Sequence, residues 1–253
     1  MTAGMHSKSR AYAGRRLTYA RETYISIDVK GVYRMDFSRY FPIWPQLTAA
    51  EREHLSAAAV CREVKQGTLL HSGSADCLGL LIVEAGRLRA YILSGEGREI
   101  TLYRLLERDV CLLSASCMMR GAQFDVAVEA ERDSTLWVIP SETYRQIMAN
   151  SAPLANYTNE LMAGRFADVM WLMEQVMWKS MDRRLAAFLL EEAALEETEV
   201  LPLTQERIGA HLGTAREVVT RMLRYFQGEG LVKLRRGAVE LTDPTGLRAL
   251  AGK

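Results

Sequence analysis

The spacing of hydrophobic positions changes three times along the chain. Between residues 61 and 139, short apolar runs such as LGLLIVEAG, FDVAVEA and STLWVIP alternate with glycine-containing breaks. These runs recur about every ten residues, a spacing that predicts the strands of a β-sandwich or barrel. Upstream of them, Thr48 followed by Glu51 is a capping-box pattern that predicts the start of a helix.

A long helix is predicted after the strands, from about Pro153 to Lys179, and proline suits its first turn. Five of its apolar residues recur in steps of four and three, which is a heptad seam: Met162, Phe166, Val169, Met173 and Val176. Further methionines and tryptophans widen the apolar surface beyond one seam. A helix packed only on its own strands accounts for one stripe, so we expect this helix to contact a second copy of the chain as well.

The stretch from Leu203 to Val232 predicts two short helices, the first of about three turns, joined through Gly213. Thr204 is a candidate N-cap for the first helix, and Thr214 for the second. The second helix has apolar residues on one face and mainly polar or basic ones on the other: Arg216, Glu217, Thr220, Arg221 and Arg224. Such a pair is a helix-turn-helix, whose second helix fits the DNA major groove. An ordinary helical hairpin with a solvated face is the alternative.

Two short predicted strands follow, with a turn at Arg235, Arg236 and Gly237, and complete a winged helix. From Thr204 to Gly237 the chain holds seven lysines and arginines against three acids, whereas its overall net charge is only +1. Positive charge is therefore concentrated where phosphates would be met. We expect base readout by Glu217 and Arg221, assisted by Arg216 and Thr220. The other expected DNA contacts, mostly to phosphates, are Thr204, Arg207, Arg235 and Arg236.

The stretch LTQERIGAHLGTAREVVTRMLRYFQGEGLV resembles the DNA-binding segment of the Crp/Fnr family of bacterial transcription regulators. The family's recognition helix has a glutamate followed, after two residues, by a small residue and an arginine, which Glu217, Thr220 and Arg221 match. VEAGRLRAYILSGEGREITLYRLLERDV resembles a meander of the family's double-stranded β-roll. The resemblance covers about Phe41 to Asp243. It implies an α+β chain with a β-roll sensor (35–151), a dimerisation helix (152–180) and a winged helix-turn-helix (181–253).

The resemblance also implies the partners. These are double-stranded DNA with a palindromic operator, a second copy of the chain in a homodimer, RNA polymerase, and a small-molecule effector bound in the roll. No apolar run reaches the roughly 20 residues that a membrane span needs. The N-terminus also lacks an apolar signal segment. We therefore expect a cytoplasmic protein without membrane contact.

The predicted sensor departs from the family members that bind cyclic AMP. Those members hold the ribose with a Gly-Glu pair and the phosphate with an Arg-Ser pair, at positions that fall here near 112–114 and at Phe124 and Asp125. An aspartate there repels phosphate, although Arg120 is nearby. We expect another effector, with a cyclic-nucleotide-responsive regulator as an alternative. The pocket residues expected are Cys111, Ser114, Ser116, Cys117, Met118, Phe124 and Met170.

The cysteines limit the cofactors that the resemblance allows. An iron-sulfur cluster like that of the oxygen-sensing branch needs about four thiolates in reach, and no cysteine precedes Cys61, so we expect none. A haem- or gas-sensing member stays open, with an axial ligand drawn from His71, Cys77, Cys111 or Met118. Cys111 and Cys117 are open to two interpretations, core packing and a thiol redox switch.

An enzyme built on a similar roll is a rival class, as is a regulatory subunit that binds no DNA. Metal cupins need several clustered histidines, but only His71 of the four histidines lies in the strand region, and no Ser-His-Asp or P-loop pattern is visible. We therefore expect no catalytic site and no metal site. The helix-turn-helix argues against the second rival.

Residues 1–34 differ from the rest, because they hold seven lysines and arginines against Glu22 and Asp28 and show little periodicity. We expect a disordered tail, or upstream sequence read from an early start codon, with Met35 as the functional start. A basic arm that touches DNA is the alternative.

Overall fold

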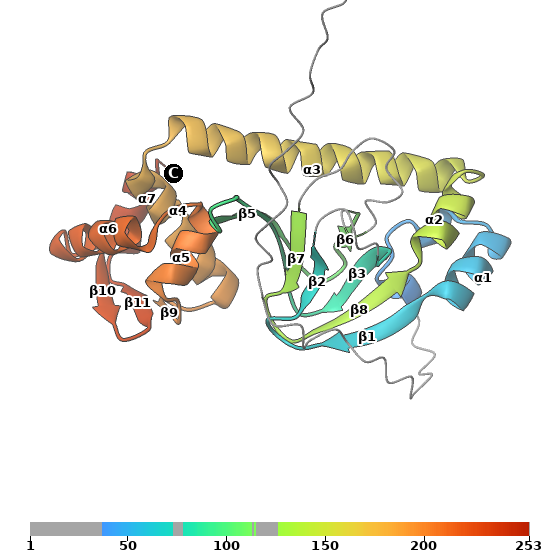
Figure 1. Ribbon diagram of the computed structural model, residues 1–253, viewed down its shortest axis with the longest axis horizontal. Coiled ribbons are helices and arrows are strands. Elements are labelled where there is room, and N and C mark those ends of the chain that lie inside the picture. The colour runs from blue at the N-terminus through green and yellow to red at the C-terminus, as the bar shows by residue number, and fades with distance from the viewer. Residues whose placement is uncertain (1–36, 73–77, 113, 115–125, 253) are drawn as a thin grey trace, which may run out of the picture. The chain divides into compact units, whose positions relative to one another are not determined.

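The computed structural model describes residues 37–72, 78–112, 114 and 126–252 (Figure 1). The expectations for residues 1–34 and for Met35 lie outside this part of the chain. Within it, none of the helices is long and apolar enough to cross a membrane.

The strand region folds into two four-stranded antiparallel sheets, which confirms the predicted β-roll (Figure 1). The first sheet has the order β1-β8-β3-β6, made of β1 (Val60–Val64), β8 (Ser134–Ile139), β3 (Leu80–Ala85) and β6 (Val110–Cys111). The second has the order β2-β7-β4-β5, made of β2 (Leu69–Ser72), β7 (Val126–Ala130), β4 (Leu88–Leu93) and β5 (Glu99–Leu105).

Side-chain alternation divides each strand between two environments. Leu88 and Ala90 of β4 join Leu81 and Val128 in the apolar core between the sheets. Arg89, between Leu88 and Ala90, points to the opposite face of its sheet and is nevertheless fully buried. The outer face of this sheet is therefore covered by another part of the molecule.

Short helices cover the outer face of the other sheet. They are η1 (Phe37–Arg39), η2 (Trp44–Gln46), α1 (Ala49–Ala58) and α2 (Ser141–Met148). Leu55 and Tyr144 pack with Ile82 and Trp137 in a second apolar core. The predicted capping box is confirmed, since the Thr48 side chain accepts from the Glu51 amide and the Thr48 amide donates to Glu51 Oε2 at 2.6 Å.

The long helix is α3 (Ala152–Trp178), with Ser151 as its N-cap, so the prediction is right to within one residue at each end. Of the five seam residues, Met162 packs against the core of its own roll. The other four side chains are exposed in the single chain, from 39% for Val169 to 68% for Phe166. An exposed apolar row of this length is unusual for a surface that stays in water.

The C-terminal part is the predicted winged helix-turn-helix. It contains α4 (Met181–Glu196), β9 (Val200–Leu201), α5 (Gln205–Leu212), α6 (Arg216–Gly228), β10 (Val232–Arg235), β11 (Ala238–Leu241) and α7 (Pro244–Ala251). A three-stranded sheet has the order β10-β11-β9. Leu189, Ile208, Val219, Leu223 and Phe226 are central to its apolar core.

Two details of the helix-turn-helix differ from the sequence-based expectation. α5 is a two-turn helix, because Gly213 adopts the left-handed conformation (φ +69°) at its C-cap. α6 begins after Ala215, which makes no side-chain cap, so the expectation that Thr214 caps it is wrong. The Thr214 amide donates to the Gly209 carbonyl instead and closes the turn through the backbone.

Charged residues on the outer face of the β2-β7-β4-β5 sheet meet α4 and α5. In this contact five arginines face five glutamates, so the charges balance: Arg87, Arg89, Arg104, Arg132 and Arg207 with Glu99, Glu129, Glu131, Glu192 and Glu196. Apolar contact supplements them, because Ile100 of β5 pairs with Leu212 and packs on Gly213. The winged helix-turn-helix is thus held on the roll mainly by salt bridges.

His211 of α5 is buried inside this ionic contact. Its Nδ1 lies 2.8 Å from the Thr101 hydroxyl, and its Nε2 lies 3.3 Å from Glu131 Oε1. Because Arg89 Nε donates to the same hydroxyl at 2.7 Å, the Thr101 proton is directed to Nδ1. Nε2 then carries the histidine's proton and donates it to Glu131, which assigns a neutral tautomer to His211.

The pKa values of His211 and Glu131 are shifted in the same direction. Burial is the main reason that the pKa of His211 is lowered to about 4; the hydrogen bond to Glu131 opposes the shift, and the Arg104 and Arg89 charges add to it. Burial alone would raise the pKa of Glu131, but hydrogen bonds from His211 and Arg104 outweigh it and lower that pKa. At neutral pH the histidine is neutral and the glutamate is ionised.

We predict that His211 makes the fold less stable in mild acid. Between pH 6.5 and 4 the unfolded chain binds a proton at this residue that the folded chain does not, so the free energy of unfolding falls as the pH falls through that range. Between pH 7 and pH 5 the loss should be about 2 kcal/mol. Urea unfolding across this pH range should show a weaker dependence in His211→Gln than in the wild type.

His54 provides the matched control, because it lies exposed on α1. The His54→Gln variant should keep the wild-type pH dependence. Equal pH dependence in His211→Gln and the wild type would contradict the neutral, buried assignment of His211.

Candidate nucleic-acid interface

One face of α6 is fixed in the apolar core and the opposite face is open. Val219, Leu223 and Phe226 are buried, which sets the rotation of the helix about its axis. The charged side chains of Arg216, Glu217, Arg221 and Arg224 are exposed. Neither Glu217 nor Arg221 forms an ion pair with another residue in the described part of the chain. Their hydrogen-bonding groups are therefore available to an external partner.

Thr220 connects the two helices of the motif. Its hydroxyl lies 2.5 Å from Gln205 Oε1 and 2.9 Å from the carbonyl oxygen of Arg216. A hydroxyl has a single proton, so these two acceptors occupy its donor capacity. The methyl group of Thr220 stays available, and Gln205 acts as a brace between α5 and α6.

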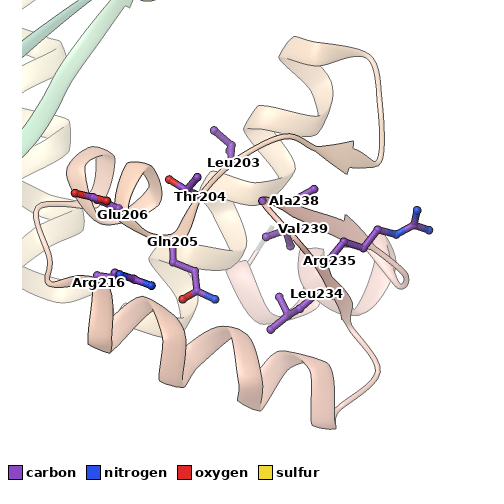
Figure 2. A pocket seen from close by; sticks show the side chains of 10 residues that line it. Leu203, Thr204, Gln205, Glu206, Arg216, Leu234, Arg235, Ala238 and Val239 are labelled. Carbon is purple, nitrogen blue, oxygen red and sulfur yellow. The ribbon is translucent and has the colours of Figure 1, made fainter.

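A groove of about 340 Å³ lies between the N-termini of both helices and the β10-β11 hairpin. Figure 2 shows Thr204, Gln205 and Glu206 on one side of it, Arg216 on a second and Arg235 with its hairpin neighbours on a third. Thr204 caps α5 by accepting from the Arg207 amide at 3.1 Å. Other amides of the first turn have no partner within the helix, so this end favours an anion.

The two arginines predicted for the wing lie in different environments. Arg235 pairs with Glu240 of the neighbouring strand, with Nη2 2.6 Å from Oε2. Arg236 lies exposed at the hairpin turn and pairs with no residue of the described segments. Arg236 is therefore the freer cation of the two for an approaching phosphate.

Arg207 differs from the other predicted DNA contacts, because its side chain reaches the roll. Its Nη2 lies 2.8 Å from Glu129 Oε1 and 3.7 Å from Glu131 Oε1. The structure thus brings Thr204, Arg216 and Arg235 together around the groove, places Glu217, Thr220 and Arg221 along α6, and pairs Arg207 elsewhere.

The residues expected to form the effector pocket are only partly described. Cys111 is fully buried in the roll core, and Ser114 is buried with its hydroxyl 2.7 Å from the Gly79 carbonyl. Met170 is 42% exposed on α3, beside the seam residues. The remaining four lie outside the described residues: Ser116, Cys117, Met118 and Phe124. Of the haem ligands considered, His71 is buried in β2, while Cys77 and Met118 are not described.

Two functional features could not be found from sequence. Gln205 is an unremarkable polar residue in the first turn of α5, and only the structure shows that it braces Thr220. The charged residues on the outer face of the β2-β7-β4-β5 sheet alternate with core residues, as residues that face solvent also do. No sequence signal indicates that Glu129 meets Arg207, a partner 78 positions away.

Two families match separate parts of the chain. Residues 61–151 match the family described as the cyclic nucleotide-binding domain. Residues 183–250 match the family described as the Crp-like helix-turn-helix domain. The boundary between the two matches falls on α3, so the roll and the winged helix correspond to one family each.

Proteins that resemble the whole described fold agree with this. A protein of Eubacterium rectale, described as a candidate transcriptional regulator of the Crp/Fnr family, is 58% identical, with a TM-score of 0.84 over 85% of this chain and all of that one. The transcriptional activator protein FnrA of Stutzerimonas stutzeri is 27% identical over 199 residues, 76% of this chain and 80% of that protein.

A more distant structure shows the fold alone. The c-di-GMP responsive global regulator CLP of Xanthomonas campestris is 18% identical, with a TM-score of 0.66 over 78% of this chain and all of that one. With the roll, the winged helix and these likenesses taken together, the chain belongs to the Crp/Fnr family of transcriptional regulators, with a helix-turn-helix for DNA and a domain of the effector-binding type.

Proposed function

We propose that this protein is a sequence-specific transcription regulator that binds a palindromic DNA operator as a homodimer and is controlled by an effector other than cyclic AMP. The observation that carries the proposal is the row of exposed charged groups on α6, of which Glu217 and Arg221 form no ion pair with the described residues, beside a groove suited to a phosphate. RNA polymerase as a partner and a cytoplasmic location follow from this proposal.

Base readout is assigned to three residues of α6. Arg221 has two parallel N–H groups that match guanine O6 and N7, and Glu217 can accept from a cytosine amino group. Because the Thr220 hydroxyl is already engaged, its methyl group is the part that would contact a thymine methyl. Arg216, at the first turn beside the groove, supplies a further base or phosphate contact.

Phosphate contacts are assigned to the groove and the wing. The N-terminus of α5 with its Thr204 cap offers backbone amides, and Arg236 offers a cation that forms no ion pair with the described residues. Contacts of this kind fix the position of the protein on DNA but carry no sequence information. Arg224, further along α6, is assigned to the solvated surface.

We predict that the two classes of contact respond differently to mutation. Arg221→Ala should cost roughly 1–3 kcal/mol of binding free energy on the preferred site and flatten discrimination at one base pair. Arg236→Ala should weaken binding to all sequences alike and reduce the salt slope by about one unit. Selection from randomised DNA, run on the wild type and both variants, measures these effects. Full wild-type base preference in Arg221→Ala would falsify the assignment of α6 as the reading helix.

The dimer is assigned to the exposed seam of α3. Phe166, Val169, Met173 and Val176 lie on one side of the helix and leave a continuous apolar surface in water. In a parallel pair of helices, each of these side chains would fit between residues of the facing helix. Met170 is exposed in the same part of the helix, so a residue expected near the effector also lies close to this surface.

We predict that Val169→Glu combined with Met173→Glu gives monomers, because the two charges would be desolvated without partners in the seam. Sedimentation velocity at micromolar concentration measures the change. Trp171→Glu is the matched control: Trp171 is also exposed, but lies about 200° around the helix from both seam residues. It should leave the dimer intact. A wild-type protein that sediments as a monomer would exclude the proposed seam.

Cyclic AMP is disfavoured by the residues where its groups would bind. The position of the family's ribose glutamate falls at Leu112–Ser114, which offers no carboxylate, and the position of the phosphate arginine falls at Phe124 and Asp125. The Ser114 hydroxyl is within hydrogen-bonding distance of two backbone carbonyls, those of Gly79 and Cys111. A buried cyclic phosphate without a paired cation is strongly unfavourable.

We predict that titration calorimetry with cyclic AMP and cyclic GMP gives no binding in the micromolar range. The same titrations repeated on the protein–operator complex test for an effect that requires DNA. Saturable micromolar binding that changes the affinity for DNA would show that the effector assignment is wrong.

A further inference from the structure

Arg89 of the roll holds the first helix of the DNA-binding motif. Its Nη2 donates to the carbonyl oxygen of Ala210 in α5 at 3.1 Å. Its Nη1 lies 2.6 Å from Glu99 and 3.1 Å from Glu129, and none of its side-chain surface is exposed. A guanidinium cannot lose its charge at physiological pH, so this position requires its anionic partners.

Arg207 makes the reciprocal contact from α5 to the roll. It pairs with the same Glu129 oxygen that faces Arg89, at 2.8 Å. We call Arg89, Glu129, Arg207 and the Ala210 carbonyl the clasp. Glu129 is its shared element, because one carboxylate oxygen pairs with a cation from each side of the contact.

The clasp and DNA compete for Arg207. This residue lies in the first turn of α5, whose N-terminus lines the groove assigned to a phosphate. While Arg207 is paired with Glu129, it cannot replace a counterion on the DNA backbone. A phosphate that reached Arg207 would also come close to the carboxylates of Glu129 and Glu131. Like charges at such distances repel by several kcal/mol where screening is weak. The recognition face of α6 stays exposed, so the clasp does not act by covering it.

We propose, on the basis of the proposed function, that the clasp is an autoinhibitory contact: it withdraws Arg207 from the DNA backbone and holds the helix-turn-helix on the roll, and it opens when the protein binds its operator tightly. The roll can control it, because clasp residues alternate with core residues on the same strands. Arg89 lies between Leu88 and Ala90, and Glu129 lies between Val128 and Ala130. A ligand that shifts β4 or β7 from the core side also shifts the clasp.

Glu129→Gln tests the opening of the clasp in the full-length protein. The variant removes the shared charge and keeps the shape of the side chain, and Arg89 retains Glu99. It should bind the selected operator on the order of tenfold more tightly than the wild type, a typical coupling between sites. Its salt slope should be steeper by about one unit per subunit, because Arg207 is freed. Adding Arg207→Gln should abolish both gains. Glu142→Gln, which removes an exposed carboxylate of α2 with the same change in net charge, should change neither.

A reversible lock tests the closed clasp without relying on the stability of that variant. A Cβ built on Gly213 lies 3.1 Å from the Cβ of Ile100, a little closer than the roughly 3.5–4.5 Å in disulfides, so a small backbone shift brings the two within bonding geometry. Cysteine at position 213 is strained because φ is +69°, and the reduced double-cysteine protein is the reference because it carries the same strain. Ile100→Cys with Gly213→Cys should therefore fix α5 on the roll when oxidised. The oxidised protein should bind the operator on the order of tenfold more weakly than the same protein after reduction. The wild type, taken through the same oxidation and reduction, controls for the native cysteines.

The outcomes separate the two proposals. Equal operator affinity in the oxidised and reduced double-cysteine protein, or wild-type affinity and salt slope in a folded Glu129→Gln variant, would overturn the clasp alone. Failure of both the wild type and Glu129→Gln to select any DNA sequence would overturn the proposed function, and the clasp with it.

Discussion

The burial of Arg89 is the constraint on which the arrangement of this molecule depends. A guanidinium stays charged, and a buried charge is tolerated only when anions and hydrogen-bond acceptors surround it. The roll itself supplies Glu99, Glu129 and the Thr101 hydroxyl, but one further acceptor, the Ala210 carbonyl, comes from α5. The outer face of the β2-β7-β4-β5 sheet is therefore complete only when the helix-turn-helix lies on it. The roll neutralises the charge of Arg89 with its own carboxylates, and α5 completes the hydrogen bonding of the guanidinium.

An ionic contact suits the opening proposed for the clasp. In a buried ion pair the loss of hydration offsets most of the attraction, so such pairs specify geometry more than they stabilise it. Five arginines balanced by five glutamates can also be rehydrated when the contact opens, whereas a separated apolar face would stay exposed to water. His211, neutral and hydrogen-bonded at both ring nitrogens, adds no net charge to this balance. The apolar part of the contact is small and centres on Ile100 against Gly213.

Sequence predicted the elements well and their mutual contacts poorly, for a physical reason. Periodicity is a local signal, and the long helix, the capping box at Thr48 and the winged motif follow from it. The expected cap at Thr214 failed because the turn after α5 is closed by backbone hydrogen bonds, which leave no trace in side-chain identity. For Arg89, alternation indicates only that it points out of the roll core. Whether water or another domain lies there depends on a partner 121 positions away, which no local pattern encodes.

The same ionic contacts affect the distance between the two recognition helices of a dimer, which has to match a palindromic site. Two recognition helices must lie about one turn of DNA apart, roughly 34 Å. In the proposed dimer α3 fixes the two rolls, but its last residues lead into α4, so the spacing also depends on where α4 lies. Glu192 and Glu196 near the end of α4 pair with Arg104 and Arg87 of the roll. A change in these pairs would move α4 and α6 together, because both belong to one apolar core. In the proposed dimer, the distance between the two α6 helices and the availability of Arg207 would therefore be coupled through one charged surface, so an effector acting on that surface would change both.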